Sequence, residues 1–394
     1  YYYPTADLVT APEIMFFWVA RMIIAGYEYR GEAPFKNVYY TGIVRDQQGR
    51  KMSKSLGNSP DPIELMNQYG ADGVRVGMLL TSPAGNDLPF DEKLCEQGRN
   101  FANKIWNAFR LTQGWEVDDQ VEQRESSAQA IAWMQSRVNE VLTELDAQFA
   151  EFRLSEALMG TYRLVWDDFC SWYLELVKPA YEKPLDRKTY DATVELFESI
   201  LKILHPFMPF QTEEIWHWIG KRDTPEEALC IAPWPTVGSM DQPLLEHFET
   251  FKHIVSEVRN VRKQNQIPHR DALSLHVDSG EGYPASLESA LIKLCNLSAI
   301  EQTVEKVPNS FGFLVGRSSF FIPFGAAVDV DAEKEKIQKE IQHITGFLKA
   351  VQGKLSNERF VSNAPDAVVV LERKKESDAL SKLEVLTSKL NDLG

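Results

Sequence analysis

The sequence predicts a multidomain, mainly α-helical protein, and three observations lead to this prediction. The chain has 394 residues, enough for about two to four domains. Apolar residues recur at helical spacing over most of its length, and strand-like aromatic and β-branched runs are few. A heptad repeat occupies residues 332–393. We therefore expect, in order, a partial α/β segment, a helical bundle, a small α/β unit and an antiparallel coiled-coil hairpin.

The composition, with 44% hydrophobic and 25% charged residues, is that of a globular protein. No apolar run approaches the roughly eighteen residues of a membrane span, so we expect no membrane partner. The N-terminal Tyr1-Tyr2-Tyr3-Pro4 has no features of a signal peptide and suggests a cut inside a larger protein. The cysteines lack metal-ligand spacing, which favours free thiols in a reducing cytoplasm over zinc or disulfides. They are Cys95, Cys170, Cys230 and Cys295.

The net charge of −15 lowers the expectation of a nucleic-acid partner without excluding one. Binding needs only one basic face, and the total charge does not report on faces. From residue 331 onward eleven basic residues balance eleven acidic ones, so the excess negative charge precedes the heptad segment.

The first elements predict an α/β arrangement. Residues 13–26 have helical spacing, and residues 37–45 form a strand that runs into a loop. A loop after a strand is where sites lie at the carboxyl edge of an α/β sheet. Short helices follow at Pro62–Gly70 and Asp72–Leu80, with Asp72 as the expected N-cap.

Helical periodicity continues from Glu92 to about Trp218 and predicts a bundle. The further helices are expected at 128–150, 153–178, 186–204 and 213–218. A smaller α/β unit follows, with helices at 244–264 and 284–295 and strands at 273–277, 299–304 and 313–322. In the last segment two heptad series are separated by residues 356–366, which predicts the hairpin. The series are Ile337, Ile341, Ile344, Leu348, Val351, Leu355 and then Ala379, Leu383, Leu386, Leu390, Leu393.

The most informative motif is Lys51-Met52-Ser53-Lys54-Ser55. Its two lysines can point into one site, where an ammonium group suits a phosphate oxygen. Gly49 and Gly57 flank the motif and favour a mobile loop. An isolated cluster of this kind is most often a solvated basic turn. A given five-residue string arises by chance with odds on the order of one in ten thousand in a chain of this length.

With its flanks, residues 44–50 and 56–62, the motif resembles the signature loop of class I aminoacyl-tRNA synthetases. The resemblance implies an ATP-binding loop of residues 51–55, with ATP and Mg²⁺ arriving as a substrate complex. It implies that Lys54, with Lys51 beside it, stabilises the charge that builds on the α-phosphate and pyrophosphate. The first 60 residues would then be the C-terminal part of a Rossmann catalytic domain.

Residues 10–22 resemble the helix that carries amino-acid selectivity in valyl-tRNA synthetases. The resemblance implies that Ile14 and Trp18 line a valine pocket, although both would also suit an ordinary core. Ala11, Pro12 and Glu13 depart from the family pattern at the start of this helix, and the apolar core of the motif is intact.

Residues 99–107, 166–175 and 204–210 resemble segments of that family's anticodon-binding bundle. The implied anticodon contacts are Lys93, Arg99, Asn103, Lys104 and Arg110, with Lys104 as the best match. Taken singly, each is more often a solvated surface residue. Leu111 stands where relatives carry an aromatic stacking residue. In the arm, Lys336, Lys339, Lys349 and Arg359 are candidate phosphate contacts, or residues of a solvated coiled-coil surface.

We expect no resident metal, because the histidines show no metal-ligand spacing. His343-Ile344-Thr345-Gly346 superficially resembles the second class I signature, His-Ile-Gly-His. It lies inside a heptad helix after the lysine motif, which favours a structural role.

The resemblance covers the whole chain and implies five parts. These are residues 1–60 of the catalytic domain, connecting helices at 61–91, the bundle at 92–240, the small unit at 241–330 and the arm at 331–394. The implied function is activation of valine by ATP and its transfer to tRNA(Val), by an enzyme expected to be a monomer at full length. The fragment is expected to be inactive alone. The alternative is a non-catalytic tRNA-binding or coiled-coil interaction module.

Overall fold

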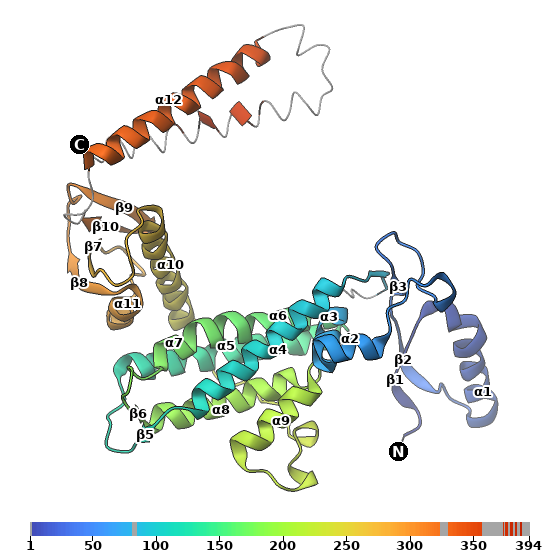
Figure 1. Cartoon of the computed structure of the whole chain (residues 1–394). Helices are drawn as coiled ribbons and strands as arrows, with labels where there is room; N and C mark the ends of the chain where they lie inside the picture. Colours follow the sequence, from blue (N-terminus) through green and yellow to red (C-terminus); the bar gives the residue numbers. More distant parts are fainter. Residues whose placement is uncertain are drawn as a thin grey trace. The chain divides into compact units, whose positions relative to one another are not determined.

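The computed structural model describes residues 2–80, 85–323 and 330–356, together with residues 373, 375, 376, 379, 380, 383 and 387. At residues 54, 330–337 and 340 only the backbone is described. The chain is mostly helical with small sheets, as predicted, and forms two compact units, Tyr1–Leu245 and Glu246–Gly394 (Figure 1). Within the described residues, no helix is both long and apolar enough to cross a membrane.

The first unit opens with a strand–helix–strand element. Its parts are β1 (Thr5–Thr10), a 3₁₀ turn (Pro12–Ile14), a π-helical turn (Met15–Val19), α1 (Ala20–Arg30) and β2 (Phe35–Tyr40). The two strands pair in parallel, with Thr5 opposite Phe35 and Thr10 opposite Tyr40. The helix expected at 13–26 therefore lies within a longer helical run that ends at Gly31, where φ is +76°.

The strand expected at 37–45 is divided in two. After β2 the chain forms β3 (Val44–Arg45), which pairs in parallel with β4 (Leu88–Pro89). Between β2 and β3, Gly42 lies against the Asn86 carbonyl, and a Cβ at this position would come within 1.5 Å of that oxygen. Only glycine permits this approach, which turns the chain toward the lysine motif.

Two short helices, α2 (Pro62–Tyr69) and α3 (Ala71–Leu79), occupy the predicted positions. The prediction that Asp72 caps its own helix is wrong, because the N-cap is Gly70. Asp72 is buried, and its carboxylate accepts a hydrogen bond of 2.7 Å from the backbone N–H of Gln211 in the first turn of a distant helix. A long-range backbone partner has replaced the local one.

The bundle contains the predicted helices (Figure 1). They are α4 (Glu92–Gln113), α5 (Glu125–Ala150), α6 (Leu154–Arg163), a π-helical stretch (Leu164–Tyr173), α7 (Leu174–Val177), α8 (Arg187–Leu204) and α9 (Pro209–Gly220). The last begins four residues before the expected 213–218, because Pro209 starts it. A two-stranded pair, β5 (Val117–Asp118) and β6 (Leu185–Asp186), joins two of the connections. Large side chains fill the core, including Phe101, Trp133, Phe169, Tyr173 and Phe197.

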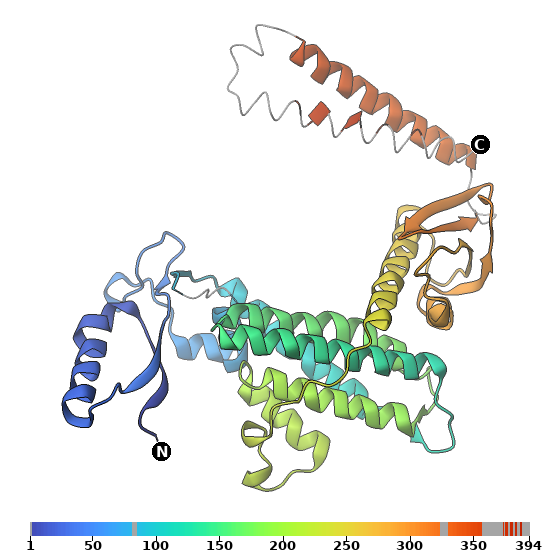
Figure 2. The ribbon, with the colours of Figure 1, turned by 180° about the vertical axis from the view of Figure 1, so that it is seen from behind.

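The small α/β unit follows α10 (Gln242–Gln264) and contains α11 and four strands (Figure 2). Its elements are β7 (Leu273–Asp278), α11 (Glu288–Cys295), β8 (Leu297–Gln302), β9 (Ser310–Val315) and β10 (Ser318–Pro323). The strand order is β8-β7-β10-β9. The single strand predicted at 313–322 is wrong. The region is a hairpin that turns at Gly316, where φ is +60°.

The last helix whose two ends lie among the described residues is α12 (Val330–Leu355). Its heptad residues Ile344, Leu348 and Val351 are buried, as is Ala379 in the return segment. Gln352 donates a hydrogen bond of 3.1 Å to Glu376, so these described positions lie beside α12. The predicted heptad residues Leu386, Leu390 and Leu393 lie outside the described residues, as does the side chain of Ile337.

Candidate functional site

The lysine loop, residues 46–58, follows β3 directly and carries the signature motif. A bridge between Arg45 and Lys51 closes its base in antiparallel fashion. The tip of the first turn is Gly49, where φ is +77°, and the loop ends near Gly57, where φ is +64°. Both angles favour glycine, so the flanking glycines have a conformational role.

Asp46 organises the first half of the loop. Its carboxylate accepts hydrogen bonds from the backbone N–H groups of Gln48 (3.0 Å) and Arg50 (2.8 Å) and from the Arg50 side chain. A fourth bond, of 2.9 Å, comes from the Asn58 side chain at the other end of the loop. Because these bonds, led by that of Asn58, favour the charged form, the pKa of Asp46 is lowered to about 2.

Lys51 pairs with Glu13, at the start of the helical run that the sequence assigned to valine selectivity. Its Nζ lies 2.8 Å and 2.9 Å from the two carboxylate oxygens. Both side chains are about half exposed, so the pair is an exposed ion pair of small net strength, on the order of 0–1 kcal/mol. The backbone of Lys54 begins a short 3₁₀ turn, Lys54–Leu56, and its side chain lies outside the described residues. The predicted convergence of the two lysines stays a prediction.

The residues expected to form the valine pocket lie in the π-helical turn and the 3₁₀ turn before it. Ile14 is half-buried, and Trp18 is 58% exposed. The nearest buried side chain in that turn is Val19. An ordinary core role therefore does not fit Trp18, and its pocket role stays a prediction.

The five residues expected to contact an anticodon, four of them basic, divide between two faces of α4. At about 100° per residue, Arg99, Asn103 and Arg110 share one face, and Lys93 and Lys104 share another. Arg99 lies 5.7 Å from the ring centroid of Tyr69 and forms an ion pair of 3.4 Å with a neighbouring glutamate. The five residues therefore occupy two adjacent faces of the helix.

An aromatic cluster beside Lys104 was missed by sequence reasoning. The rings of Tyr162 and Trp166 are stacked, with centroids 5.5 Å apart and an interplanar angle of 8°. Lys104 Nζ lies 5.3 Å from the centroid of Trp166. Both rings are half-buried. Their spacing of four residues was the available signal, but it is also the spacing of a helix core.

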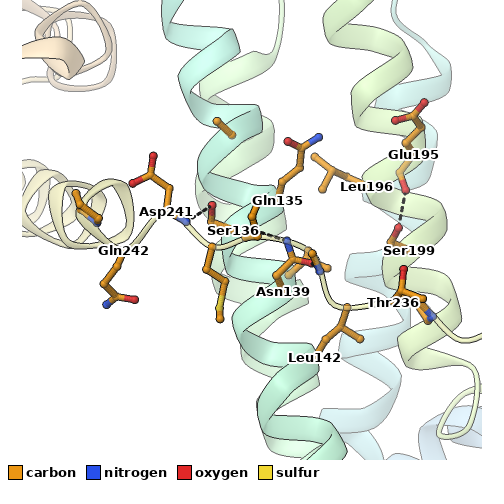
Figure 3. Close-up of a pocket in the computed structure, with 17 residues that line it drawn as sticks. Gln135, Ser136, Asn139, Leu142, Glu195, Leu196, Ser199, Thr236, Asp241 and Gln242 are labelled. Carbon is orange, nitrogen blue, oxygen red and sulfur yellow. Dashed lines mark hydrogen bonds between the residues drawn. The ribbon is translucent and has the colours of Figure 1, made fainter.

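A hollow of about 800 Å³ lies between α5, α8 and the strap formed by residues 235–243 (Figure 3). The Asn139 side chain holds the strap, donating to the Ser239 carbonyl (2.9 Å) and accepting from the Gly238 N–H (3.0 Å). The Asp241 N–H donates to Ser136 on the same helix. The described residues lining the hollow include no lysine, arginine or histidine, so it does not suit a phosphate.

No cluster of three or more potential metal ligands occurs among the side chains that the structure describes. The cysteines carry no disulfide within that part.

Three family descriptions match the chain. Residues 1–91 match "tRNA synthetases class I (I, L, M and V)", residues 132–277 match "Anticodon-binding domain of tRNA ligase", and residues 329–394 match "Valyl tRNA synthetase tRNA binding arm". The basic residues on α4 fall between the first two matched ranges.

Curated relatives match over nearly the whole chain. The valine–tRNA ligase of Christiangramia forsetii is 55% identical over 393 residues, covering 100% of this chain and 45% of the relative. That of Parabacteroides distasonis is 53% identical, covering 98% and 44%. A leucyl synthetase–tRNA complex from Agrobacterium radiobacter shares a TM-score of 0.45 and 19% identity, covering 61% of this chain and 29% of that one. This structural likeness is too low to support an argument.

The chain spans about 45% of the length of the curated relatives that it matches. Its matched segments run from the lysine loop to the arm, and every relative named above by sequence is a valine–tRNA ligase. Over its whole length the chain is similar to part of the valine–tRNA ligases, and its matched segments are those of a class I tRNA synthetase, an anticodon-binding domain and a valyl-tRNA synthetase arm.

Proposed function

We propose that this chain is the lysine-loop, anticodon-binding and arm portion of an enzyme that attaches valine to tRNA(Val). In the reaction, the valine carboxylate attacks the α-phosphate of ATP, which arrives with Mg²⁺, and pyrophosphate leaves. A terminal ribose hydroxyl of the tRNA then attacks the acyl carbon of the resulting valyl-adenylate, and AMP leaves. The observation that carries the proposal is 55% identity to a valine–tRNA ligase across 393 residues, including the lysine loop.

Lys51 and Lys54 would supply positive charge in the first step. An ammonium about 4 Å from a phosphate oxygen gains roughly 4 kcal/mol at an effective dielectric constant near 20. The Glu13 partner of Lys51 does not oppose this role, because an exposed ion pair can exchange for a phosphate at small cost. Met52, Ser53 and Ser55 would shape the rest of the ATP-binding loop.

Ile14 and Trp18 would form the valine pocket on the same strand–helix–strand element. The support is their place beside the Glu13–Lys51 pair, which joins the selectivity helix to the lysine loop. An apolar site suits an aliphatic side chain, and exposed aromatic surface commonly marks a contact surface.

The tRNA would bind along α4 and the Tyr162–Trp166 pair. Anticodon bases are commonly read by stacking and by hydrogen bonds to their edges. Lys104 and the half-buried rings offer both a cation and a π-face to a base. Arg99, Asn103 and Arg110, on the adjacent face of α4, would contact the sugar–phosphate backbone of the tRNA. Lys93 lies in the first turn of α4, and its backbone N–H donates to the side chain of the N-cap Asp91.

The arm would contact a second region of the tRNA. Lys339 and Lys349 are exposed on α12 and are candidate phosphate contacts. The side chain of Lys336 and all of Arg359 lie outside the described residues.

Each segment predicted from the sequence would have its own function. Residues 1–60 would complete a Rossmann catalytic domain, for which the parallel β1–α1–β2 element is the support. Residues 61–91 would connect it to the bundle at 92–240, and residues 241–330 would lead to the arm at 331–394. The full-length enzyme would act as a monomer in the cytoplasm.

The test is valine-dependent exchange of pyrophosphate into ATP by the full-length enzyme. We expect exchange with valine and far less with isoleucine or threonine, while the 394-residue chain alone gives none. Exchange driven equally by another amino acid would contradict the valine assignment. Exchange by the isolated chain would contradict the proposal that it holds only part of the ATP site.

A further inference from the structure

The two ends of the lysine loop are tied together by Asp46 and Asn58. We propose that this pair, the loop clasp, consists of positioning residues that set where the lysines lie during valine activation. The inference rests on the proposed function of the lysine loop. Neither residue needs to touch ATP, because each acts through the loop backbone.

Asn58 uses every hydrogen-bonding group of its side chain within the loop. Its Nδ2 donates to Asp46 Oδ2 (2.9 Å) and to the backbone carbonyl of Lys51 (3.3 Å). Its Oδ1 accepts the backbone N–H of Ser53 at 2.9 Å. One amide therefore fixes the backbone on both sides of Met52, next to each lysine.

Asp46 fixes the other strand of the loop. Its backbone N–H donates to the Arg50 carbonyl at 2.9 Å, and its carboxylate accepts the Arg50 N–H at 2.8 Å. The residue is only 8% exposed, whereas Gln47, Gln48 and Gly49 around it are exposed. Because the Asp46 carboxylate is buried and accepts four hydrogen bonds, it has a structural role in the loop.

Between the clasp points, the contacts with residues outside the loop act on Lys51 and its neighbours, through the Lys51–Glu13 pair and the bond of 3.5 Å from the Met52 N–H to the Val44 carbonyl. Residues 54–56 form a single 3₁₀ turn, in which the Leu56 N–H donates to the Ser53 carbonyl at 3.3 Å. That turn carries Lys54 and is anchored where Asn58 holds Ser53. Loss of the clasp would therefore release the turn that carries Lys54 and remove the bond from Asn58 to the Lys51 backbone. A displacement of about 1 Å from reacting geometry costs on the order of 10²-fold in rate.

The first experiment measures catalysis by the full-length ligase. We expect Asn58→Ala to lower kcat for ATP–pyrophosphate exchange on the order of 10²-fold, with KM for valine changed less than about twofold. Gln47→Ala is the matched control, because this neighbouring side chain is exposed; it should change neither constant. Unchanged kcat in Asn58→Ala, alongside an inactive Lys54→Ala, would overturn the inference and leave the proposed function standing.

The second experiment needs no activity. Trypsin cleaves after Arg50, Lys51 and Lys54, and the clasp should protect these bonds. Mass spectrometry of timed digests should show cleavage at least roughly tenfold faster in Asn58→Ala than in the wild type or Gln47→Ala. Equal rates would contradict the inference, whatever the function of the loop. Circular dichroism confirms that each variant is folded.

Exchanging the amide and the carboxylate between positions 46 and 58 distinguishes an effect on lysine position from a general loss of stability. Asn58→Asp removes both donors and places a carboxylate beside Asp46, so it should be as slow as Asn58→Ala. Adding Asp46→Asn lets the new amide donate to the new carboxylate. We expect the double variant to regain roughly tenfold in kcat over Asn58→Asp alone. No recovery, with each single variant folded, would show that the pair does not act as a unit.

Discussion

The helical bundle has a core of fully buried aromatic side chains, whereas the β1–α1–β2 element exposes most of its large aromatic side chains. In the bundle, Trp133 and Phe169 are at most 1% exposed. In the strand–helix–strand element, Phe16 is 77% exposed and Trp18 is 58% exposed. The bundle fills a core with aromatic side chains, although Phe210 and Trp218 on α9 are exposed, and the first element has no comparable core. The bundle should therefore keep its structure and its binding surface unaided, while the first element needs further contacts to build a pocket.

The largest expected effect tests whether the bundle core is self-sufficient. Phe169→Ala should lower the free energy of unfolding of the first unit by about 3–5 kcal/mol, because it leaves a cavity in a filled core. Phe16→Ala, the matched change at an exposed site, should cost less than about 0.5 kcal/mol. Urea denaturation followed by tryptophan fluorescence measures both. Similar losses for the two variants would remove the contrast between the regions.

The next effect concerns chemistry in the first region. Lys54→Ala in the full-length ligase should reduce adenylate formation by at least 10²–10³-fold, which is typical for loss of one preorganised charge donor. Valine binding should be nearly unchanged. Lys93→Ala is the control, since it alters a lysine assigned to tRNA and should leave pyrophosphate exchange intact. Wild-type exchange by Lys54→Ala would refute the role of the loop.

A smaller effect is expected at the bundle surface. Lys104→Ala should weaken binding of tRNA(Val) by roughly tenfold, a loss of about 1.4 kcal/mol. Lys202 offers a matched control, because its Nζ lies 5.6 Å from the ring centroid of Trp216 in a similar cation–π pair. Filter binding should show no change for Lys202→Ala. Equal losses of tRNA affinity in the two variants would contradict a specific role of the cluster at Trp166 in tRNA binding.

The smallest effect contrasts two aspartates across pH. Asp46 has a lowered pKa, so its stabilising contribution is present above the ordinary value of 3.8 and is lost as pH falls through about 2. Burial raises the pKa of Asp72, so its contribution is present below 3.8 and is lost as pH rises through the folded value.

Asp72→Asn should therefore flatten the fall in stability of the first unit as pH rises above 4, and Asp46→Asn should not. Urea midpoints between pH 3 and pH 7 provide the measurement. A steeper pH dependence in Asp72→Asn would contradict this account of the buried carboxyl.

The sequence predicted the long helices well because their apolar faces repeat over many turns, as in α4 and α12. It failed where a partner far along the chain decided the structure. Asp72 resembled a local N-cap, yet it binds the start of α9, 139 residues away at Gln211. Residues 313–322 gave one continuous strand signal, because a single Gly316 is a weak sign of a turn.

The candidate site was predictable only in part. The lysine motif identified the loop, and Gly49 and Gly57 proved to need positive φ. The clasp was not predictable, because Asp46 and Asn58 are twelve residues apart and become partners only when the loop folds back. The Lys51–Glu13 pair was not predictable for the same reason, because its partners are 38 residues apart in the sequence.

We propose that this chain recognises tRNA(Val) through its anticodon. The decisive measurement is gel-shift titration of the chain against tRNA(Val) and an anticodon-substituted tRNA(Val). We expect the substituted tRNA to bind at least roughly tenfold more weakly, a difference of about 1.4 kcal/mol. Equal affinity for the two tRNAs would contradict the claim.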